Sequence, residues 1–190
     1  MRLVLLGAPG SGKGTQGAAL AAHFAIPHVS SGELLRGHVA AGTELGRRAR
    51  AFLARGDLVP DDLVVEVVRD ALVSARNAHG YLLDGFPRTL AQAKRAFALA
   101  APTGETADAV IFLDIPDDVA RRRLSARAQS DRTDDADPAA LDQRLKVFHA
   151  ETVPLLEFYK QRGILVTVDA DVPVSALTEL ILDRLTPRNG

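Results

Sequence analysis

Cysteine is absent from this 190-residue sequence, and its absence excludes two kinds of protein. A chain without cysteine has neither a disulfide framework nor a zinc site built from thiolates. The formal net charge is only −1, so no whole-chain electrostatic argument favours nucleic acid or an anionic membrane as a partner. We therefore expect no structural zinc, no nucleic-acid partner and no membrane partner.

Long apolar runs are also missing. The first one covers only residues 3–6 before a glycine, which is too short for the core of a signal peptide. No stretch approaches the ~20 apolar residues needed to cross a bilayer. These features predict a cytoplasmic protein.

Lysine is scarce, because most of the 23 basic residues are arginines. A coding bias explains the large number of arginines, because the chain is also rich in alanine. Arginine side chains nevertheless bind phosphate with two parallel hydrogen bonds, so the positions of individual arginines matter.

The sequence has the length and composition of one globular domain with a substantial core. Five short apolar runs between turn signals predict strands at residues 2–6, 27–29, 81–84, 109–114 and 164–168. Apolar residues at three- and four-residue spacing, as in 63–72 and 141–148, predict helices between them. This alternation predicts an α/β fold of three layers around a five-stranded parallel sheet.

Two segments interrupt the alternation. Residues 30–59 have helical character without a strand signal, and residues 127–136, "RAQSDRTDDA", are a polar loop. Polar insertions of this kind beside a phosphate site often act as lids. We expect a single domain over residues 1–190 that carries both insertions.

Helix starts are marked by side chains that stabilise first turns. Ser30 with Glu33 predicts a capping box, and Asp137 before a proline predicts an N-cap. Pro60 followed by Asp61 and Asp62 opens a further helix.

The stretch "GAPGSGKGTQ", residues 7–16, nearly matches the phosphate-binding loop G-x-x-x-x-G-K-[ST]. It lies between a predicted strand and a predicted helix, where inward-pointing N–H groups and the helix dipole bind phosphate. The residue after Lys13 is Gly14, however, and the threonine comes one position late, at Thr15. The loop therefore lacks the usual side-chain ligand for Mg²⁺.

The stretch "YLLDGFPRT", residues 81–89, supplies a carboxylate. Asp84 ends an apolar strand at the edge of the sheet where α/β folds bind ligands, and Arg88 follows closely. Mg²⁺ keeps several waters and prefers oxygen ligands, so Asp84 is a candidate to orient Mg²⁺ through water. The alternative is a strand-end aspartate that caps a turn, which is our interpretation of Asp114.

Three weaker patterns are rejected. Gly12, Gly14 and Gly17 satisfy G-x-G-x-x-G but continue into the helix, which a dinucleotide fingerprint does not. Asp131, Thr133 and Asp135 at alternate positions suggest a calcium loop, yet the required glycine is replaced by Ala136. The five histidines lack metal or triad spacing.

Taken together, these motifs resemble the adenylate kinase family of nucleoside monophosphate kinases. The similarity includes "GAPGSGKGTQ", "SSGELLR", "RGDLVPDDL", "LLDGFPRTLAQ" and "DRTDD", in the family's order and over nearly the whole chain. It implies MgATP and AMP as substrates, ADP as product, a short lid without zinc, and a monomer.

The resemblance also implies roles for individual residues. The ATP phosphates and adenine would contact Gly10, Gly12, Lys13, Gly14, Thr15, Arg123 and Arg127. AMP would contact Ser31, Arg36, Leu58, Val59, Gly85, Arg88 and Gln92, with Gln92 hydrogen-bonded to adenine. The transferring group would lie among Lys13, Arg88, Arg127, Arg132 and Arg144. Asp84 would hold the waters of Mg²⁺, and Asp134 and Asp135 would belong to the lid. The spacing from Arg132 to Arg144 departs from typical short lids by about one residue.

The implied reaction is reversible phosphoryl transfer from MgATP to AMP. A phosphate oxygen is already ionised at neutral pH and needs no general base, in agreement with the lack of a paired His or Glu. Two alternatives remain: a kinase for another acceptor, such as UMP, CMP or a small hydroxyl compound, and a non-catalytic nucleotide sensor. A nucleic-acid-dependent ATPase is disfavoured by the charge.

Overall fold

The computed structural model describes residues 1–74, 79–128 and 137–185, except for the side chains of Ser74, Arg127 and Ala128. Five parallel strands form one sheet in the order β2-β3-β1-β4-β5. The strands are β1 (Arg2–Gly7), β2 (His28–Ser30), β3 (Tyr81–Asp84), β4 (Ala109–Asp114) and β5 (Leu165–Asp169). Each lies within one residue of its predicted position at either end, and the predicted fold class is confirmed.

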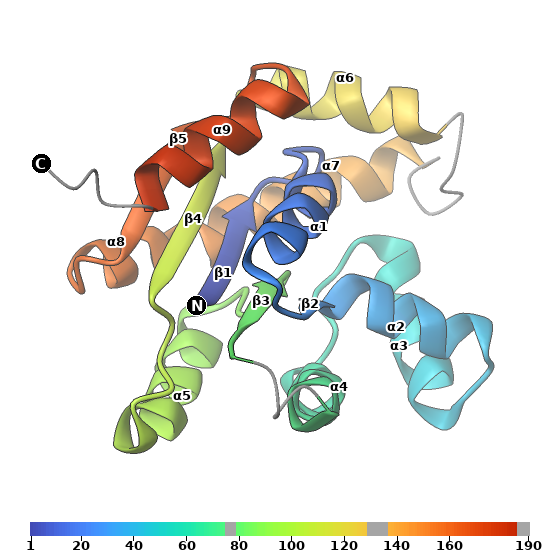
Figure 1. Cartoon of the computed structure of the whole chain (residues 1–190). Helices are drawn as coiled ribbons and strands as arrows, with labels where there is room; N and C mark the ends of the chain where they lie inside the picture. Colours follow the sequence, from blue (N-terminus) through green and yellow to red (C-terminus); the bar gives the residue numbers. More distant parts are fainter. Residues whose placement is uncertain (75–78, 129–136, 186–190) are drawn as a thin grey trace, which may run out of the picture.

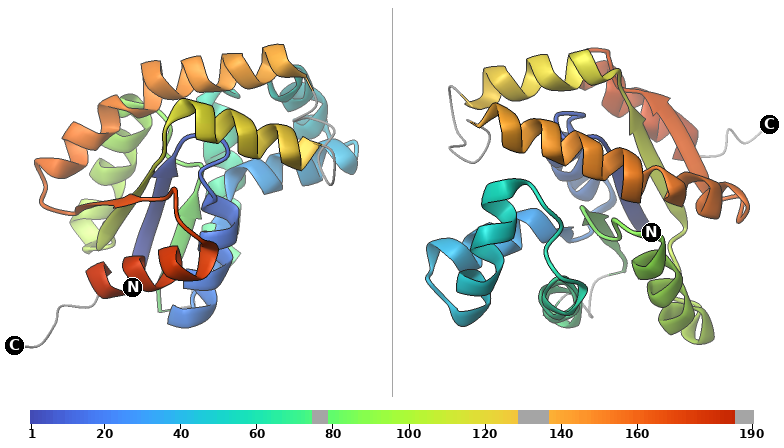
Figure 2. Two further views of the ribbon diagram at one scale, coloured as in Figure 1. Left: turned by 90° about the horizontal axis from the view of Figure 1, so that it is seen from above. Right: turned by 180° about the vertical axis from the view of Figure 1, so that it is seen from behind.

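Helices cover both faces of the sheet (Figures 1 and 2). Helix α1 (Lys13–Phe24) contacts α9 (Val174–Leu185) on one face, and α5 (Leu90–Ala100) contacts α8 (Pro154–Lys160) on the other. The remaining helices are α2 (Ser31–Ala40), α3 (Glu44–Arg55), α4 (Asp61–Ser74), α6 (Asp117–Ala128) and α7 (Pro138–Val147). A 3₁₀ turn, η1 (Ala101–Thr103), follows α5, and a π-helical turn, η3 (Phe148–Thr152), joins α7 to α8.

Most of the predicted helix starts are found. Asp137 caps α7 by accepting a hydrogen bond from the Ala139 amide at 2.9 Å, and α4 begins at Asp61 after Pro60. The predicted capping box at Ser30 is wrong. Ser30 is the N-cap of α2, but its side chain makes no capping hydrogen bond. Ser30 is also the last residue of β2 and pairs there with Asp84, so the chain passes directly from the strand into the helix.

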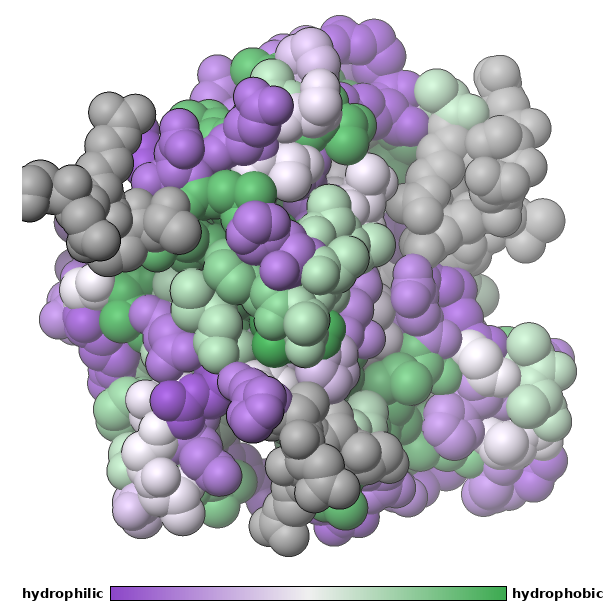
Figure 3. All heavy atoms as spheres, in the orientation of Figure 1, coloured by the Kyte–Doolittle hydropathy of each residue, from purple (hydrophilic) through white to green (hydrophobic). Residues whose placement is uncertain are grey.

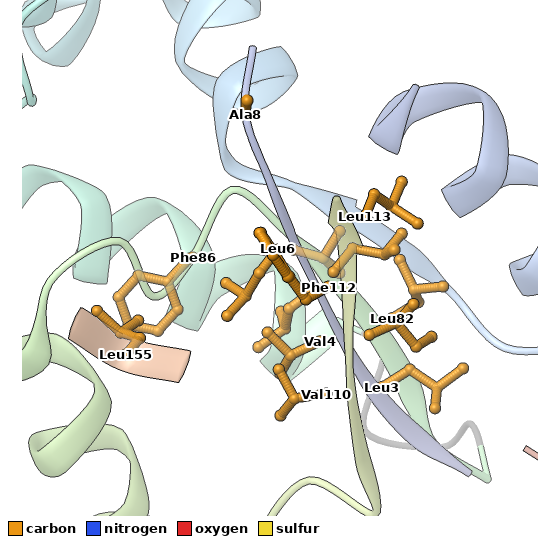
Figure 4. Close-up of a cluster of buried hydrophobic side chains, with 14 of the residues drawn as sticks. Leu3, Val4, Leu6, Ala8, Leu82, Phe86, Val110, Phe112, Leu113 and Leu155 are labelled. Atoms are coloured by element: carbon orange, nitrogen blue, oxygen red, sulfur yellow. The ribbon is translucent and has the colours of Figure 1, made fainter. Parts of the chain in front are cut away.

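The core lies between the sheet and its helices and consists mainly of aliphatic side chains from the strands (Figure 4). Leu3 and Val4 come from β1, Leu82 from β3 and Leu155 from α8, and Phe86 belongs to the turn after β3. Apolar side chains on both faces explain why the strands are nearly continuous apolar runs.

Leu82→Ala tests this core. Leu82 is 0 % exposed, and we expect the substitution to lower the free energy of unfolding by about 2–5 kcal/mol, because it removes buried methyl groups and leaves a cavity. The matched control is Leu99→Ala, since Leu99 is 71 % exposed in α5 and should change little. Denaturant unfolding of both variants measures the difference. Equal losses of unfolding free energy would contradict the placement of Leu82 in the core.

The surface mixes polar and apolar residues. Figure 3 shows hydrophilic and hydrophobic side chains interspersed on the face that carries α1 and α9. Within the described residues, none of the helices combines the length and the apolar character needed to cross a membrane.

Candidate active site

A cleft of about 530 Å³ opens beside the carboxyl ends of β1 and β3, the edge at which the sequence predicted a ligand site. Residues from six parts of the chain line it: the loop before α1, the start of α2, the end of α3 with the loop after it, the turn after β3, helix α6, and helix α7 with η3. Predicted site residues that line the cleft are Gly10, Gly12, Lys13, Gly14, Thr15, Arg36, Leu58, Asp84, Gly85, Arg88, Arg123 and Arg144.

The loop between β1 and α1 folds tightly over itself. The ammonium of Lys13 donates hydrogen bonds to the carbonyl oxygens of Gly7 and Ala8, at 2.7 and 2.9 Å. Gly10 has a φ of 84°, and a Cβ there would lie 2.7 Å from the Ala120 carbonyl oxygen, so only glycine fits. Lys13 is the first residue of α1, and the loop therefore brings an ammonium group to a helix N-terminus.

Asp84 is a buried carboxylate at the end of β3, 7 % exposed. Its Oδ2 lies 3.7 Å from His28 Nε2, on the neighbouring strand β2. Burial is the largest influence and raises the pKa of Asp84, but contact with His28 and the positive charges of Lys13 and Arg88 outweigh it. The net pKa lies below the ordinary value, and the group is a carboxylate at neutral pH.

The turn after β3 fixes Arg88 in the cleft wall. Its Nε donates to the Gly85 carbonyl oxygen at 2.8 Å, and its own carbonyl accepts from the Thr152 hydroxyl at 3.0 Å. Burial lowers the pKa of Arg88; Asp84 raises it, and the charge of Arg144 lowers it further. Two guanidinium groups from distant parts of the chain thus share one cleft, which is a suitable environment for an anion.

Gly85 is required by this turn. Its φ is 78°, and a Cβ would lie 2.8 Å from Ser31 Oγ and 3.0 Å from Arg88 Nη2. We expect Gly85→Ala to displace Arg88 and lower the rate of nucleotide turnover by at least tenfold. The substitution should also lower the free energy of unfolding by about 1–2 kcal/mol, because alanine is strained at this positive φ.

Gly104→Ala is the matched control for that substitution. Gly104 has a similar φ of 68°, and among the described residues a Cβ there would meet no heavy atom within 4 Å. Both variants should lose similar stability in thermal unfolding, but only Gly85→Ala should lose turnover. Similar turnover in the two variants would contradict the role given to the Gly85 contacts.

The α6 end of the cleft is formed by Arg123. One of its guanidinium nitrogens donates to the Ala170 carbonyl oxygen at 3.0 Å, and another to Asp171 Oδ1 at 3.2 Å. Both acceptors lie in the loop between β5 and α9, so Arg123 has a fixed orientation at the cleft edge.

Three residues predicted for AMP lie behind the cleft wall. Ser31 is 1 % exposed, and its hydroxyl donates to the Asp84 carbonyl oxygen at 3.3 Å. Val59 is buried, and Gln92 is 4 % exposed with its amide hydrogen-bonded to protein groups. Their predicted contacts with AMP stay predictions.

The predicted lid residues Arg132, Asp134 and Asp135 lie outside the described residues, and so does the side chain of Arg127. Sequence reasoning missed several neighbours of the site. His28 was not singled out, because the histidines lack metal or triad spacing, but it reaches Asp84, while Gly17 of α1 provides room for its ring. Thr152 and Asp171 were not singled out, because only the folded chain brings them to Arg88 and Arg123.

Comparison with known proteins agrees with this geometry. A family model described as adenylate kinase matches residues 5–164 of the chain. The chain belongs to the adenylate kinase family. It is 45% identical to an adenylate kinase of Xanthomonas oryzae pv. oryzae over 190 residues, which cover 100% of both chains. It is 43% identical to an adenylate kinase of Thermobifida fusca over 188 residues, 99% of this chain and 100% of the relative.

Membership in the adenylate kinase family confirms the resemblance inferred from the motifs. It also confirms the prediction of a nucleotide-binding phosphotransferase that acts on ATP and AMP. The altered loop, with Gly14 after Lys13, thus lies in a chain of the adenylate kinase family.

Proposed function

We propose that this cleft carries out reversible phosphoryl transfer from MgATP to AMP, with the residues named above in defined roles. The proposal rests on one observation: Lys13, Arg36, Arg88, Arg123 and Arg144 line a single cleft together with the carboxylate of Asp84. Five cations gathered around one cavity suit a triphosphate and a monophosphate brought end to end.

The loop before α1 would bind the ATP phosphates through its amides and Lys13, while Arg123 would stack on the ATP adenine. Arg36 and Arg88 would bind the AMP phosphate from the opposite side. Arg88 and Arg144 would then stabilise the charge that develops on the transferring group. The attacking oxygen is already ionised, so these side chains align and stabilise and no proton needs to be removed.

Magnesium would enter with ATP and neutralise charge on the phosphate oxygens. The donors present fit this metal, because Asp84 is an ionised oxygen ligand that lines the cleft beside the loop. Within the described residues no group of three or more His, Cys, Asp or Glu side chains could hold a metal ion. Asp84 would accordingly hold waters that are bound to Mg²⁺, and these waters and ATP oxygens would be the ligands of the metal.

Three further features of this proposal rest on the sequence and on the resemblance to the family. They are a cytoplasmic monomer, a lid at residues 127–136 and an acceptor site in residues 30–59. Closure of the two insertions over both substrates would exclude water, which otherwise competes with AMP as the acceptor.

A coupled assay tests the reaction and the acceptor together. The purified chain is given MgATP with AMP, CMP, UMP or GMP, and formation of ADP is followed. We expect AMP to be the preferred acceptor. Faster reaction with UMP or CMP would replace the proposed acceptor, and tight ATP binding without turnover would favour a nucleotide sensor.

A further inference from the structure

The side-chain amide of Gln92 is held at both of its ends. Its Oε1 accepts a hydrogen bond from the Arg88 backbone amide at 2.7 Å, and its Nε2 donates to Asp61 Oδ1 at 2.6 Å. Its own backbone amide donates to the hydroxyl of Thr89, the N-cap of α5. Asp61 belongs to a different helix, α4, and lies 31 residues away in the sequence.

These two partners allow only one orientation of the amide. A glutamine amide that is free to rotate by 180° presents its oxygen and nitrogen in either order. A backbone N–H group can only donate a hydrogen bond, and a carboxylate can only accept one. Rotation would turn the NH₂ group toward the Arg88 N–H and the oxygen toward the Asp61 carboxylate, and both contacts would be repulsive.

Among the described residues, these two contacts leave the amide one hydrogen-bond donor and one acceptor site, in a defined order. Arg88, whose backbone amide bonds to Gln92, lines the cleft together with Gly85 and Pro87, while Gln92 itself is 4 % exposed. Adenine presents an acceptor at N1 beside a donor at N6, which complements an amide. Hypoxanthine has the same shape but presents a donor at N1 and an acceptor at O6, so it requires the reverse order. Cytosine shares the adenine pattern and uracil shares that of hypoxanthine.

We propose that Asp61 is a specificity-determining residue, which fixes the Gln92 amide in the order that matches adenine and mismatches 6-oxopurines. Asp61 acts through Gln92 and is a positioning residue. The inference rests on the proposed function, because it requires the acceptor base to meet Gln92. A site that hydrogen-bonds its substrate discriminates strongly, since the wrong base leaves buried polar groups unpaired.

A purely structural role makes a different prediction. The Asp61–Gln92 contact also joins the start of α4 to α5, and its loss could weaken only this junction. In that case stability would fall while the preference among acceptor bases stayed the same. The ratio of the reactivities of two purine acceptors separates these interpretations.

The experiment compares AMP with IMP, the nucleotide of hypoxanthine, as acceptors for MgATP. It uses the full-length wild type and the variants Asp61→Asn, Asp61→Glu and Asp62→Asn. An asparagine at position 61 can donate as well as accept, so the constraint on the amide order at that end is lost and only the Arg88 N–H still favours one order. Asp62 lies in the same first turn of α4 and pairs with Arg48 at 3.0 Å, so its variant controls for the lost charge.

We expect the ratio of kcat/KM for AMP to that for IMP to fall about tenfold in Asp61→Asn. Asp61→Glu and Asp62→Asn should keep a ratio within about twofold of the wild type, and thermal unfolding checks that all variants fold. An unchanged ratio in Asp61→Asn, with AMP still the preferred acceptor of the wild type, would overturn this inference alone. A wild type that does not phosphorylate AMP would overturn the proposed function and, with it, the inference.

Discussion

Arg88→Ala is expected to lower kcat for ADP formation by about 10³–10⁵-fold, which corresponds to about 4–7 kcal/mol of transition-state stabilisation. Arg88 lies in the cleft wall beside Asp84, and its guanidinium shares the cavity with Arg144. An arginine there stabilises charge that is greatest when the phosphoryl group lies between donor and acceptor. The rate should therefore fall more than the affinity for either nucleotide.

Two further variants make this test specific. Arg88→Lys keeps the charge but loses the planar pair of donors, so it should recover only part of the activity. Arg69→Ala is the control, because Arg69 is an exposed residue of α4 that pairs with its neighbour Asp70. Steady-state kinetics with folded protein gives the result. Near-normal turnover in Arg88→Ala would remove Arg88 from the catalytic residues.

The framework of the site could be predicted because its signals are local. A phosphate loop needs glycines at fixed spacing between a strand and a helix, and a strand-end aspartate follows an apolar run, so both are visible in the sequence. The parallel sheet then brings Asp84 to the same edge as the loop, since β1 and β3 are neighbours. Arg88 follows within one turn and reaches the same cleft.

The contacts that orient these groups could not be predicted, because each joins residues far apart in sequence. Asp61 was interpreted as an acidic residue that stabilises a helix start, which is correct but incomplete. Its contact with Gln92 depends on how α4 and α5 pack, and no periodicity encodes that. His28 reaches Asp84 only because β2 pairs with β3, although the two strands are separated by three helices in the chain.

The capping box failed for a related reason. The spacing of Ser30 and Glu33 is a local signal, yet sheet formation placed Ser30 at the end of β2. Tertiary structure decided the backbone conformation there, and the side-chain capping bond did not form. Local patterns are thus most reliable where no strand pairing competes with them, as at Asp137.

Asp84→Asn is the second substitution with a large expected effect. Asparagine has nearly the same shape, so the buried position at the end of β3 remains filled while the negative charge is lost. That charge persists in the folded protein because His28, Lys13 and Arg88 hold the pKa of Asp84 below its ordinary value. We expect kcat to fall by about 10²–10³-fold and the Mg²⁺ concentration needed for half-maximal activity to rise.

Asp114→Asn provides the matched control, because Asp114 also ends a strand, β4, but is exposed and was interpreted as structural. Activity measured against Mg²⁺ concentration distinguishes the two aspartates. A loop with Gly14 where Ser or Thr is usual must have its metal oriented from elsewhere, and Asp84 is a cleft carboxylate whose pKa is lowered by the charge of Lys13, among other groups. If Asp84→Asn kept the wild-type Mg²⁺ dependence and Asp114→Asn did not, the metal would be held from β4 and the role proposed for Asp84 would be wrong.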